Sequence, residues 1–485
     1  MGQAHPSVIL INCDDLGYGD LGCYGSTLNR TPALDRMAAE GVRFTDFYAA
    51  SPVCSPSRAA MLTGSYPNRI GFGGKAAGNL GGVLFPGWSV GLNPSEITIA
   101  RLLSDAGYAT KLVGKWHCGD QPPFLPTAHG FDEYYGLPYS NDMGRQVDDP
   151  DRRVHGLSPD DIEPLLRKMG CEEPWIRPPL PLMVDDEVLE AQPDQAALTG
   201  RYLEQAVRFI RAKHDQPFFL YLAHMYVHLP IYVQERFKQA SQNGDYGAAV
   251  ECIDWVTAVI LAELQALGLD EQTLVIFTSD NGALAVENGG SGSNAPLRGS
   301  KGNTWDGGQR VPCIVRWPGR IPAGIETDAV TTQIDLYPTI AAACGVATPT
   351  DRVIDGHDLR SVLGLDGPEL EDERHFFYIR SANIEAVRIG PWKLHVVKDG
   401  QDVSQLYHLA NDIAETTDVA AEHPDVVARL TAVIETGRLA LGDERLGIEG
   451  SEVRPLGKVD DPVPLTDFDP DHPYFMAEYD LADRG

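Results

Sequence analysis

Short apolar runs rich in β-branched and aromatic residues alternate with segments of helical periodicity over most of the chain. Strands that alternate with helices are typical of a largely parallel sheet whose two faces are both covered. The pattern therefore predicts an α/β fold. The clearest expected strands are 7–12, 109–114, 218–223 and 273–280, and the clearest expected helices are 194–212 and 248–268.

A different pattern begins near residue 370, where HFFYIR, EAVRIG and WKLHVV form three closely spaced strand patterns. A helical pattern follows near His423, and this order predicts a small α+β module with an antiparallel sheet. The 485 residues also exceed the size at which a single core usually stops growing. We therefore expect a large domain over 1–366, a smaller domain over 367–450 and a tail over 451–485.

The segment from about 142 to 195 is rich in proline and acidic residues, which predicts an irregular excursion over the surface. We expect this segment and the tail to form the rim of a pocket. Three aromatic residues are candidates for stacking on a substrate ring, although ordinary packing explains each of them as well. They are Tyr139, Trp175 and Trp305.

The formal net charge of −30 argues against nucleic acid or an anionic membrane as a partner, because both would be repelled at long range. The sequence contains no apolar stretch long enough for a membrane-spanning helix. Its first residues lack the pattern of a secretory signal, so we expect a cytoplasmic protein, or a periplasmic or secreted one if a leader has been removed. The oligomeric state is not indicated.

The eight cysteines are scattered, and no CxxC pair occurs among them. This spacing predicts mostly reduced thiols and does not support a structural zinc site.

Hard oxygen ligands follow two of the expected strands at the point where each strand ends. Asp14 and Asp15 follow VILINC, and Asp280 and Asn281 follow TLVIFTS. Ligands of open α/β sheets bind at strand ends, so the two pairs are expected to meet there. Three carboxylates and one amide, without His or Cys, favour Ca²⁺ or Mg²⁺ over Zn²⁺ or copper. Taken separately, each pair is also compatible with ordinary turn chemistry.

Cys54 lies in SPVCSPSRAAMLTG, where Pro56 suits the first turn of a helix and Arg58 follows one turn after the cysteine. A helix N-terminus and a guanidinium both favour a bound oxyanion. A buried, inert cysteine is the alternative for this residue considered alone.

This segment resembles the signature of the type I sulfatases, C-x-P-x-R followed by L-T-G. The resemblance implies an alkaline phosphatase-like fold and oxidation of Cys54 to formylglycine (3-oxoalanine) by the formylglycine-generating enzyme. In that family one hydroxyl of the hydrated aldehyde attacks sulfur. Deprotonation of the other hydroxyl then releases sulfate.

Further segments match the family in the same order along the chain. GYATKLVGKWH, 107–117, resembles a second signature, in which Lys115 binds sulfate and His117 assists deprotonation. We expect a strand to run to this point, with the alternation of side chains placing Lys115 and His117 on one face.

The family resemblance also implies roles for His228, Lys301 and Ser140. His228, in VHLP, approaches the leaving-group oxygen, and Lys301 is the second sulfate-binding lysine. Ser140 lies near the formylglycine. His224 competes with His228 for its role but lacks the proline that follows, and we interpret it as packing or supporting the site.

Asp14, Asp15, Asp280 and Asn281 match the metal ligands of the family, which implies Ca²⁺, with Mg²⁺ or Mn²⁺ as less favoured ions. The predicted function is hydrolysis of aryl or sugar sulfate monoesters. A phosphonate monoester or phosphodiester hydrolase of the same superfamily is the nearest alternative. A non-catalytic protein that binds sulfated glycans and an enzyme with a thiol nucleophile at Cys54 are alternatives of other classes.

Overall fold

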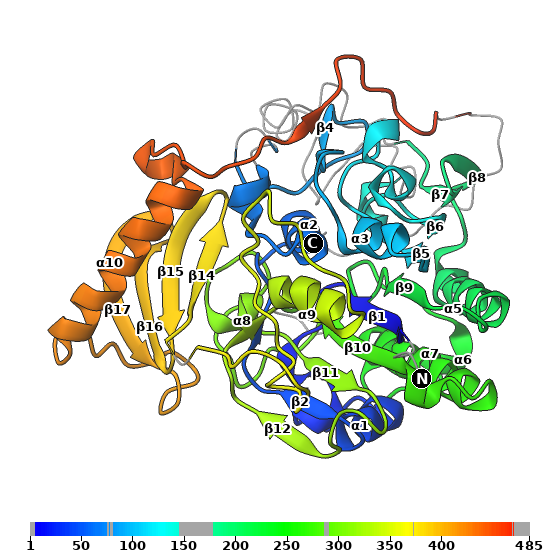
Figure 1. The fold of residues 1–485 in the computed structure, drawn as a ribbon, viewed down its shortest axis with the longest axis horizontal. Helices are drawn as coiled ribbons and strands as arrows, with labels where there is room; N and C mark the ends of the chain where they lie inside the picture. The colour runs from blue at the N-terminus through cyan, green and yellow to red at the C-terminus, as the bar shows by residue number, and fades with distance from the viewer. Residues whose placement is uncertain are drawn as a thin grey trace.

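The protein is described by a computed structural model over residues 5–74, 77, 81–144, 178–285, 291–371, 373–467 and 469. A ten-stranded sheet lies at its centre, and a separate four-stranded sheet lies to one side (Figure 1). Within the described residues, no helix has the length and apolar character needed to cross a bilayer.

The centre of the large sheet is parallel, and one strand on each side of this centre runs antiparallel to both of its neighbours. Its strands run in the order β12-β2-β11-β10-β1-β9-β5-β6-β7-β8, and β10, β1, β9, β5 and β6 are mutually parallel. These central strands are β10 (Thr273–Ser279), β1 (Ser7–Cys13), β9 (Phe218–Ala223), β5 (Ala109–Gly114) and β6 (Glu133–Gly136). The flanking strands are β12 (Ile325–Thr327), β2 (Val42–Phe44), β11 (Cys313–Arg316), β7 (Pro181–Val184) and β8 (Glu187–Ala191).

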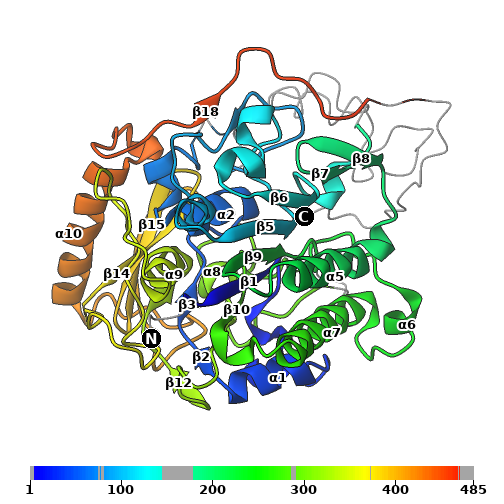
Figure 2. The same ribbon diagram turned by 45° about the vertical axis from the view of Figure 1, so that its right-hand side comes forward.

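Helices cover both faces of this sheet. On one face Ile9 and Ile11 of β1 join a core with α1 (Pro32–Ala39), α5 (Gln195–Ala212) and α7 (Gly244–Ala266). On the other face Val8 and Leu10 join a core with α2 (Cys54–Thr63), α3 (Ile99–Asp105) and α9 (Leu336–Ala343). Figure 2 shows the strands between these two groups of helices. Because alternate side chains of one strand enter two cores, the apolar runs are continuous, as the sequence predicted.

The smaller sheet is an antiparallel meander of β14 (His375–Arg380), β15 (Asn383–Ile389), β16 (Trp392–Lys398) and β17 (Gln401–His408). α10 (Pro424–Leu441) covers it, with Leu430 and Ile434 in the shared core. Two short helices, α6 (Glu235–Lys238) and α8 (Asp306–Gln309), and two two-stranded pairs complete the described elements longer than a 3₁₀ turn. The pairs are β3 (Phe47–Tyr48) with β13 (Thr331–Thr332) and β4 (Val90–Gly91) with β18 (Gly457–Lys458).

The α/β sheet and the antiparallel module predicted from the sequence are both present. The expectation of an irregular segment over 142–195 was wrong for its last part, because β7 and β8 form a hairpin that extends the large sheet. Leu182 and Met183 of β7 are buried, so their apolar character outweighs the surrounding prolines. Residues 145–177, including Trp175, lie outside the described part. The division at residue 366 remains a prediction.

The described part of the tail returns to the large domain, and we call residues 451–467 the strap. Its β18 pairs with β4, and Thr466 donates a hydrogen bond to the carbonyl of Pro179. Arg454 of the strap binds the buried carboxylate of Glu96, with 2.7 Å between Nε and Oε1. The strap therefore packs along the loop that contains β4.

Candidate active site

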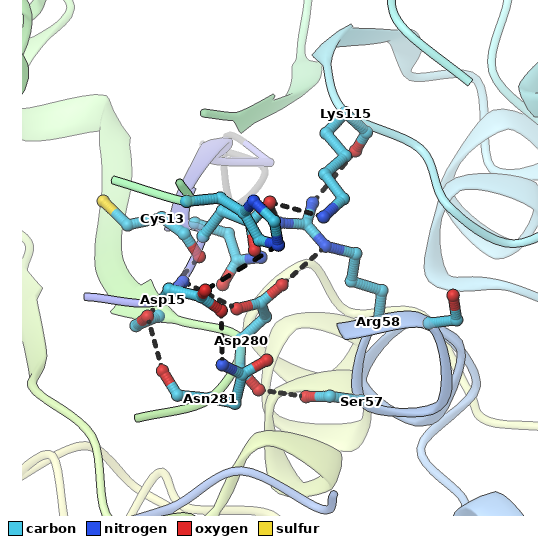
Figure 3. Close-up of polar contacts among 12 residues, drawn as sticks. Cys13, Asp15, Ser57, Arg58, Lys115, Asp280 and Asn281 are labelled. Atoms are coloured by element: carbon cyan, nitrogen blue, oxygen red, sulfur yellow. Dashed lines mark hydrogen bonds and ion pairs between the residues drawn. The ribbon is translucent and has the colours of Figure 1, made fainter. Parts of the chain in front are cut away.

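The C-terminal ends of adjacent parallel strands bring the predicted metal ligands together. β1 and β10 pair in register up to Cys13 and Ser279, so Asp14 and Asp280 leave the same sheet edge side by side. The backbone N–H of Asp15 donates to Asp280 Oδ1 at 3.2 Å, and Asn281 Nδ2 donates to Asp15 Oδ1 at 2.7 Å. These residues are 266 positions apart in sequence, and Figure 3 shows them converging.

Three cations neutralise this buried acidic cluster. Arg58 Nε donates to Asp280 Oδ2 at 2.8 Å, Lys115 Nζ to Asp14 Oδ2 at 2.5 Å, and Lys301 Nζ to Asp15 Oδ2 at 2.9 Å. Burial alone disfavours the charged form of Asp14, but the surrounding cations, led by Lys115, lower its pKa far below the ordinary range. Burial and the charge of Asp14 raise the pKa of Asp280 to about 7. We call the four strand-end residues and these three cations the pocket floor.

Two oxygens of the pocket floor support its assignment as a cation site. Asp14 Oδ1 and Asn281 Oδ1 are buried and have no hydrogen-bond partner in the described structure. A buried acceptor without a partner is costly, and a cation bound between these oxygens would remove that cost. Ligand atoms of Asp14, Asp15 and His228 also lie within 4.8 Å of one another. The oxygen-rich donor set fits Ca²⁺ or Mg²⁺.

Cys54 is the first residue of α2, as the position of Pro56 in the sequence predicted. It is 2% exposed and lies at the positive end of the helix dipole. Burial raises the pKa of its thiol to about 11, against the opposing effect of Lys115 and Lys301. An unmodified Cys54 is therefore a neutral thiol near pH 7, which disfavours the alternative of a thiolate nucleophile.

Lys115 and His117 follow β5 rather than continuing it. The expectation of one strand with both side chains on one face was wrong, because β5 ends at Gly114 and His117 has a φ of 63°. The turn directs the two side chains to different partners. Lys115 Nζ donates to Ser140 Oγ at 2.8 Å as well as to Asp14, and His117 Nε2 lies 3.0 Å from the carbonyl oxygen of Leu84.

The partner of His117 decides where its proton lies. A carbonyl oxygen only accepts, so Nε2 carries the proton and Nδ1 is the basic atom. Nδ1 is buried and has no partner among the described residues. Burial, reinforced by Lys115, lowers the pKa of His117 well below its usual value, so the imidazole is neutral and able to accept a proton.

His228 and His224 are placed differently, although both follow β9. His228 Nδ1 lies 2.5 Å from the carbonyl of Leu229, which leaves Nε2 facing Asp15 Oδ2 at 3.8 Å. Burial and Lys301 lower the pKa of His228. His224 is buried with neither ring nitrogen bonded in the described structure, and burial lowers its pKa to about 3. His228 lines the pocket described next, and His224 does not.

A pocket of about 460 Å³ adjoins the pocket floor at Lys301. Among the predicted site residues, Cys54, His117, Ser140, His228 and Lys301 line it. Four further lining residues, which are half-buried or exposed, form what we call the outer wall: Val83, Phe85, Arg380 and Ser381. Tyr139 and Trp305 do not line it. Trp305 packs against His395, with Arg298 and Lys398 each 3.8 Å from its ring centroid.

Several residues that support the site carried no sequence signal. Gln333 is buried, accepts a hydrogen bond from Ser57 Oγ at 2.7 Å and donates to the carbonyl of Ser279. The carbonyl oxygen of Asp280 is the second acceptor within reach of the same hydroxyl, so the single proton of Ser57 is shared between the two acceptors. This network joins the first turns of α2 to the end of β10. Ser57 lies within the signature segment, so the sequence could have indicated that it supports the site. Gln333 lies in no recognisable motif, so the sequence carries no signal for it.

Comparisons with known proteins agree with this geometry. The model of the sulfatase family matches residues 6–346, and a model for the C-terminal part of N-sulphoglucosamine sulphohydrolase matches residues 301–438. Steryl-sulfatase of Mus musculus is 40% identical over 432 residues, which cover 79% of this chain and 69% of that protein. N-acetylgalactosamine-6-sulfatase of Canis lupus familiaris is 37% identical over 478 residues, covering 89% and 85%.

A solved structure extends the agreement to the fold. The PsFucS1 sulfatase from Pseudoalteromonas sp. superposes with a TM-score of 0.77 at 28% identity, and the match covers 92% of each chain. The expected alkaline phosphatase-like architecture is thereby confirmed. Taken with the neutralised acidic cluster at the strand ends, these matches show that the chain belongs to the sulfatase family and is a sulfuric ester hydrolase.

Proposed function

We propose that Cys54 is oxidised to formylglycine by the formylglycine-generating enzyme. We also propose that Asp14, Asp15, Asp280 and Asn281 bind Ca²⁺, and that the substrates are monoesters of sugars or phenols. The observation that carries this proposal is the position of Cys54. It lines the pocket at the start of α2, where the charges of Lys115, Lys301 and Asp14 act on it.

The formylglycine at position 54 and the cation supply complementary chemistry when they are present. The hydrated aldehyde offers a hydroxyl nucleophile, and the cation polarises a sulfate oxygen and favours the ionised hydroxyl. The residues of the chain orient these groups. Arg58 holds Asp280 and, through Nη1, the carbonyl of Lys115 at 3.0 Å, so the helix, the acidic cluster and the turn after β5 form one rigid unit.

Lys115 and Lys301 bring positive charge to the sulfate. Each is bound to one carboxylate of the pocket floor, so its ammonium group is held in place before the substrate arrives. A donor that is already oriented stabilises developing negative charge without reorganisation. The whole chain carries a formal charge of −30, so oriented cations at the site are needed to retain an anionic ester.

The two histidines have separate proton roles. His117 Nδ1 accepts a proton from the hydroxyl at position 54 in the step that releases sulfate, because its Nε2 is already bound to Leu84. His228 Nε2, which faces the pocket floor, donates a proton to the leaving oxygen when the ring is doubly protonated. Replacing His117 should therefore slow the release of sulfate, and replacing His228 should slow the departure of the alcohol.

Mass spectrometry and paired kinetics test the proposal. The protein is co-expressed with the formylglycine-generating enzyme, and the peptide containing residue 54 is examined for conversion of the thiol to the aldehyde. Hydrolysis of 4-nitrophenyl sulfate is then compared with that of bis(4-nitrophenyl) phosphate and an aryl phosphonate, with and without Ca²⁺. Conversion together with Ca²⁺-dependent sulfate release in excess of the other reactions is the expected result.

Other outcomes would favour the alternatives. Faster cleavage of the phosphodiester or phosphonate would overturn the preference for sulfate esters. Binding of sulfated saccharides without turnover, in protein with an unmodified Cys54, would indicate a glycan-binding role.

A further inference from the structure

The outer wall contains one cation that no catalytic role explains. Arg380 is the last residue of β14, is exposed, and lines the same pocket as Cys54 and Lys301. In the part of the chain that the structure describes, its guanidinium makes no hydrogen bond or ion pair. Two other arginines of this sheet region are paired: Arg374 with Asp335 at 2.8 Å, and Arg388 with Asp46.

The turn that carries Arg380 is fixed in place. Ser381 and Ala382 connect β14 to β15 with φ values of 48° and 59°, the left-handed geometry of a two-residue hairpin turn. The carbonyl oxygen of Ala382 accepts hydrogen bonds from Asn68 Nδ2 at 3.2 Å and from the backbone N–H of Glu444 at 3.4 Å. Arg380 is therefore held at the pocket by a turn that is bound on two sides.

The same turn lies close to the residue that precedes Cys54. A Cβ atom built on Gly81 would lie 3.6 Å from Ser381 Oγ and 3.7 Å from Val53 Cγ2. Both Gly81 and Val53 line the pocket. The small antiparallel sheet thus supplies part of the wall of the pocket that contains Cys54. Arg380, the last residue of β14, brings to this wall a guanidinium that has no partner among the described residues.

We propose that Arg380 binds a second anionic group of the substrate, a carboxylate or a second sulfate, in addition to the sulfate that is cleaved. The inference rests on the proposed function. It narrows the substrates to sulfated saccharides or aryl sulfates that carry another negative charge near the scissile ester. A guanidinium presents paired donors that match the two oxygens of such a group.

The charged residues around the pocket limit where a second anion can bind. Lys301 and Arg380 are the lysine and arginine among the described residues that line the pocket. Lys301 is bound to Asp15 at the pocket floor. On a chain with a formal charge of −30, a second anion is retained only beside a local cation, and Arg380 is the outer-wall residue that provides one.

Two isosteric esters test the proposal on enzyme converted to formylglycine. The first is 3-carboxyphenyl sulfate and the second is 3-carbamoylphenyl sulfate, which has the same shape without the charge. A saccharide pair, glucosamine 2-N,6-O-disulfate and N-acetylglucosamine 6-sulfate, repeats the comparison for a second sulfate. We expect the wild-type protein to prefer the more anionic member of at least one pair by about tenfold in kcat/KM, chiefly through KM.

Variants at position 380 test whether the guanidinium of Arg380 causes the preference for the more anionic substrate. In Arg380→Met the ratio between the paired substrates should fall to about one, and Arg380→Lys should recover part of it because the charge remains without the planar fork. Arg320→Met is the matched control. Arg320 is exposed and follows β11, which ends beside the start of β10, whereas the site lies beyond the end of β10. Arg320→Met therefore removes one positive charge far from the pocket, and the ratio between the paired substrates should persist.

The outcomes separate this inference from the proposed function. If the wild-type protein shows no preference in either pair, or if Arg380→Met keeps the wild-type preference, the role of Arg380 is wrong. If converted enzyme releases no sulfate from any of the esters, the proposed function itself fails. An equal fall in kcat for both members of a pair would indicate a structural role for Arg380 and would also overturn its assignment to anion binding.

Discussion

Lys301 of the pocket floor and the residues of the outer wall line the same pocket, but the floor and the wall are built in different ways. The floor consists of fully or nearly fully buried charges that neutralise one another at the ends of β1 and β10 and at the start of α2. The outer wall comes from a loop before β4 and from the turn after β14, and it includes an exposed cation without a partner in the described structure.

This difference suggests that the floor carries out the catalytic chemistry and that the wall selects the substrate. Each charge of the floor is fixed by another charge, so a change at one position leaves an uncompensated buried group. The outer wall has no such constraint, and its residues are free to differ without loss of the catalytic arrangement. The floor should therefore govern kcat, and the wall should govern KM and the ranking of substrates.

Replacing Cys54 should have the largest effect. Cys54→Ala removes the residue that is proposed to become the nucleophile, and we expect kcat for 4-nitrophenyl sulfate to fall by at least about 10⁴-fold. The melting temperature should change little, because only the terminal group of one side chain is removed. Activity of Cys54→Ala within tenfold of the wild type would contradict the role of this residue.

Removing the cation should have the next largest effect. Treatment with EGTA should abolish most activity and lower the melting temperature, because Asp14, Asp15 and Asp280 then lose a compensating charge. Ca²⁺ at about 100 times its Kd should restore about 2.7 kcal/mol of stability. Calorimetry and activity measured on the same samples provide the test. Full activity after exhaustive chelation would exclude the proposed metal site.

Neutralising one lysine of the floor should cost less than either of these changes. Lys301→Met removes an oriented donor next to the sulfate, and we expect kcat to fall by about 10²- to 10³-fold. Lys238→Met is a suitable control, because Lys238 lies on the surface helix α6 and pairs only with Asp245 among described residues. A change confined to KM for Lys301→Met would place Lys301 with the outer wall instead.

Disturbing the strap should have the smallest effect on chemistry. Arg454→Met leaves the buried carboxylate of Glu96 without its principal partner, which should lower the free energy of unfolding by about 1–3 kcal/mol. Because the strap packs along the loop that leads from the outer wall, we expect KM to rise by less than about threefold and kcat to stay unchanged. Urea unfolding and steady-state kinetics measure the two effects. A large fall in kcat would show that the strap also supports the floor.

The sequence predicted the floor better than the wall because the two carry different kinds of signal. Apolar runs fixed the positions of β1, β5, β9 and β10 within a residue or so, and polar residues directly after them had to share one sheet edge. The turn after β5 was missed, since its partners lie far away in sequence: Lys115 contacts Asp14 and Ser140, and the left-handed His117 contacts Leu84.

The sequence by itself determined the α/β architecture, the antiparallel module and the identity of the residues at the strand ends, because periodicity and motif spacing are local properties. Only the tertiary structure decided that Gln333 supports the floor, that the strap returns to β4, and that Arg380 reaches the pocket of Cys54. These residues act across separations of hundreds of positions. Their neighbours in sequence say nothing about them, since long-range packing alone brings them into contact.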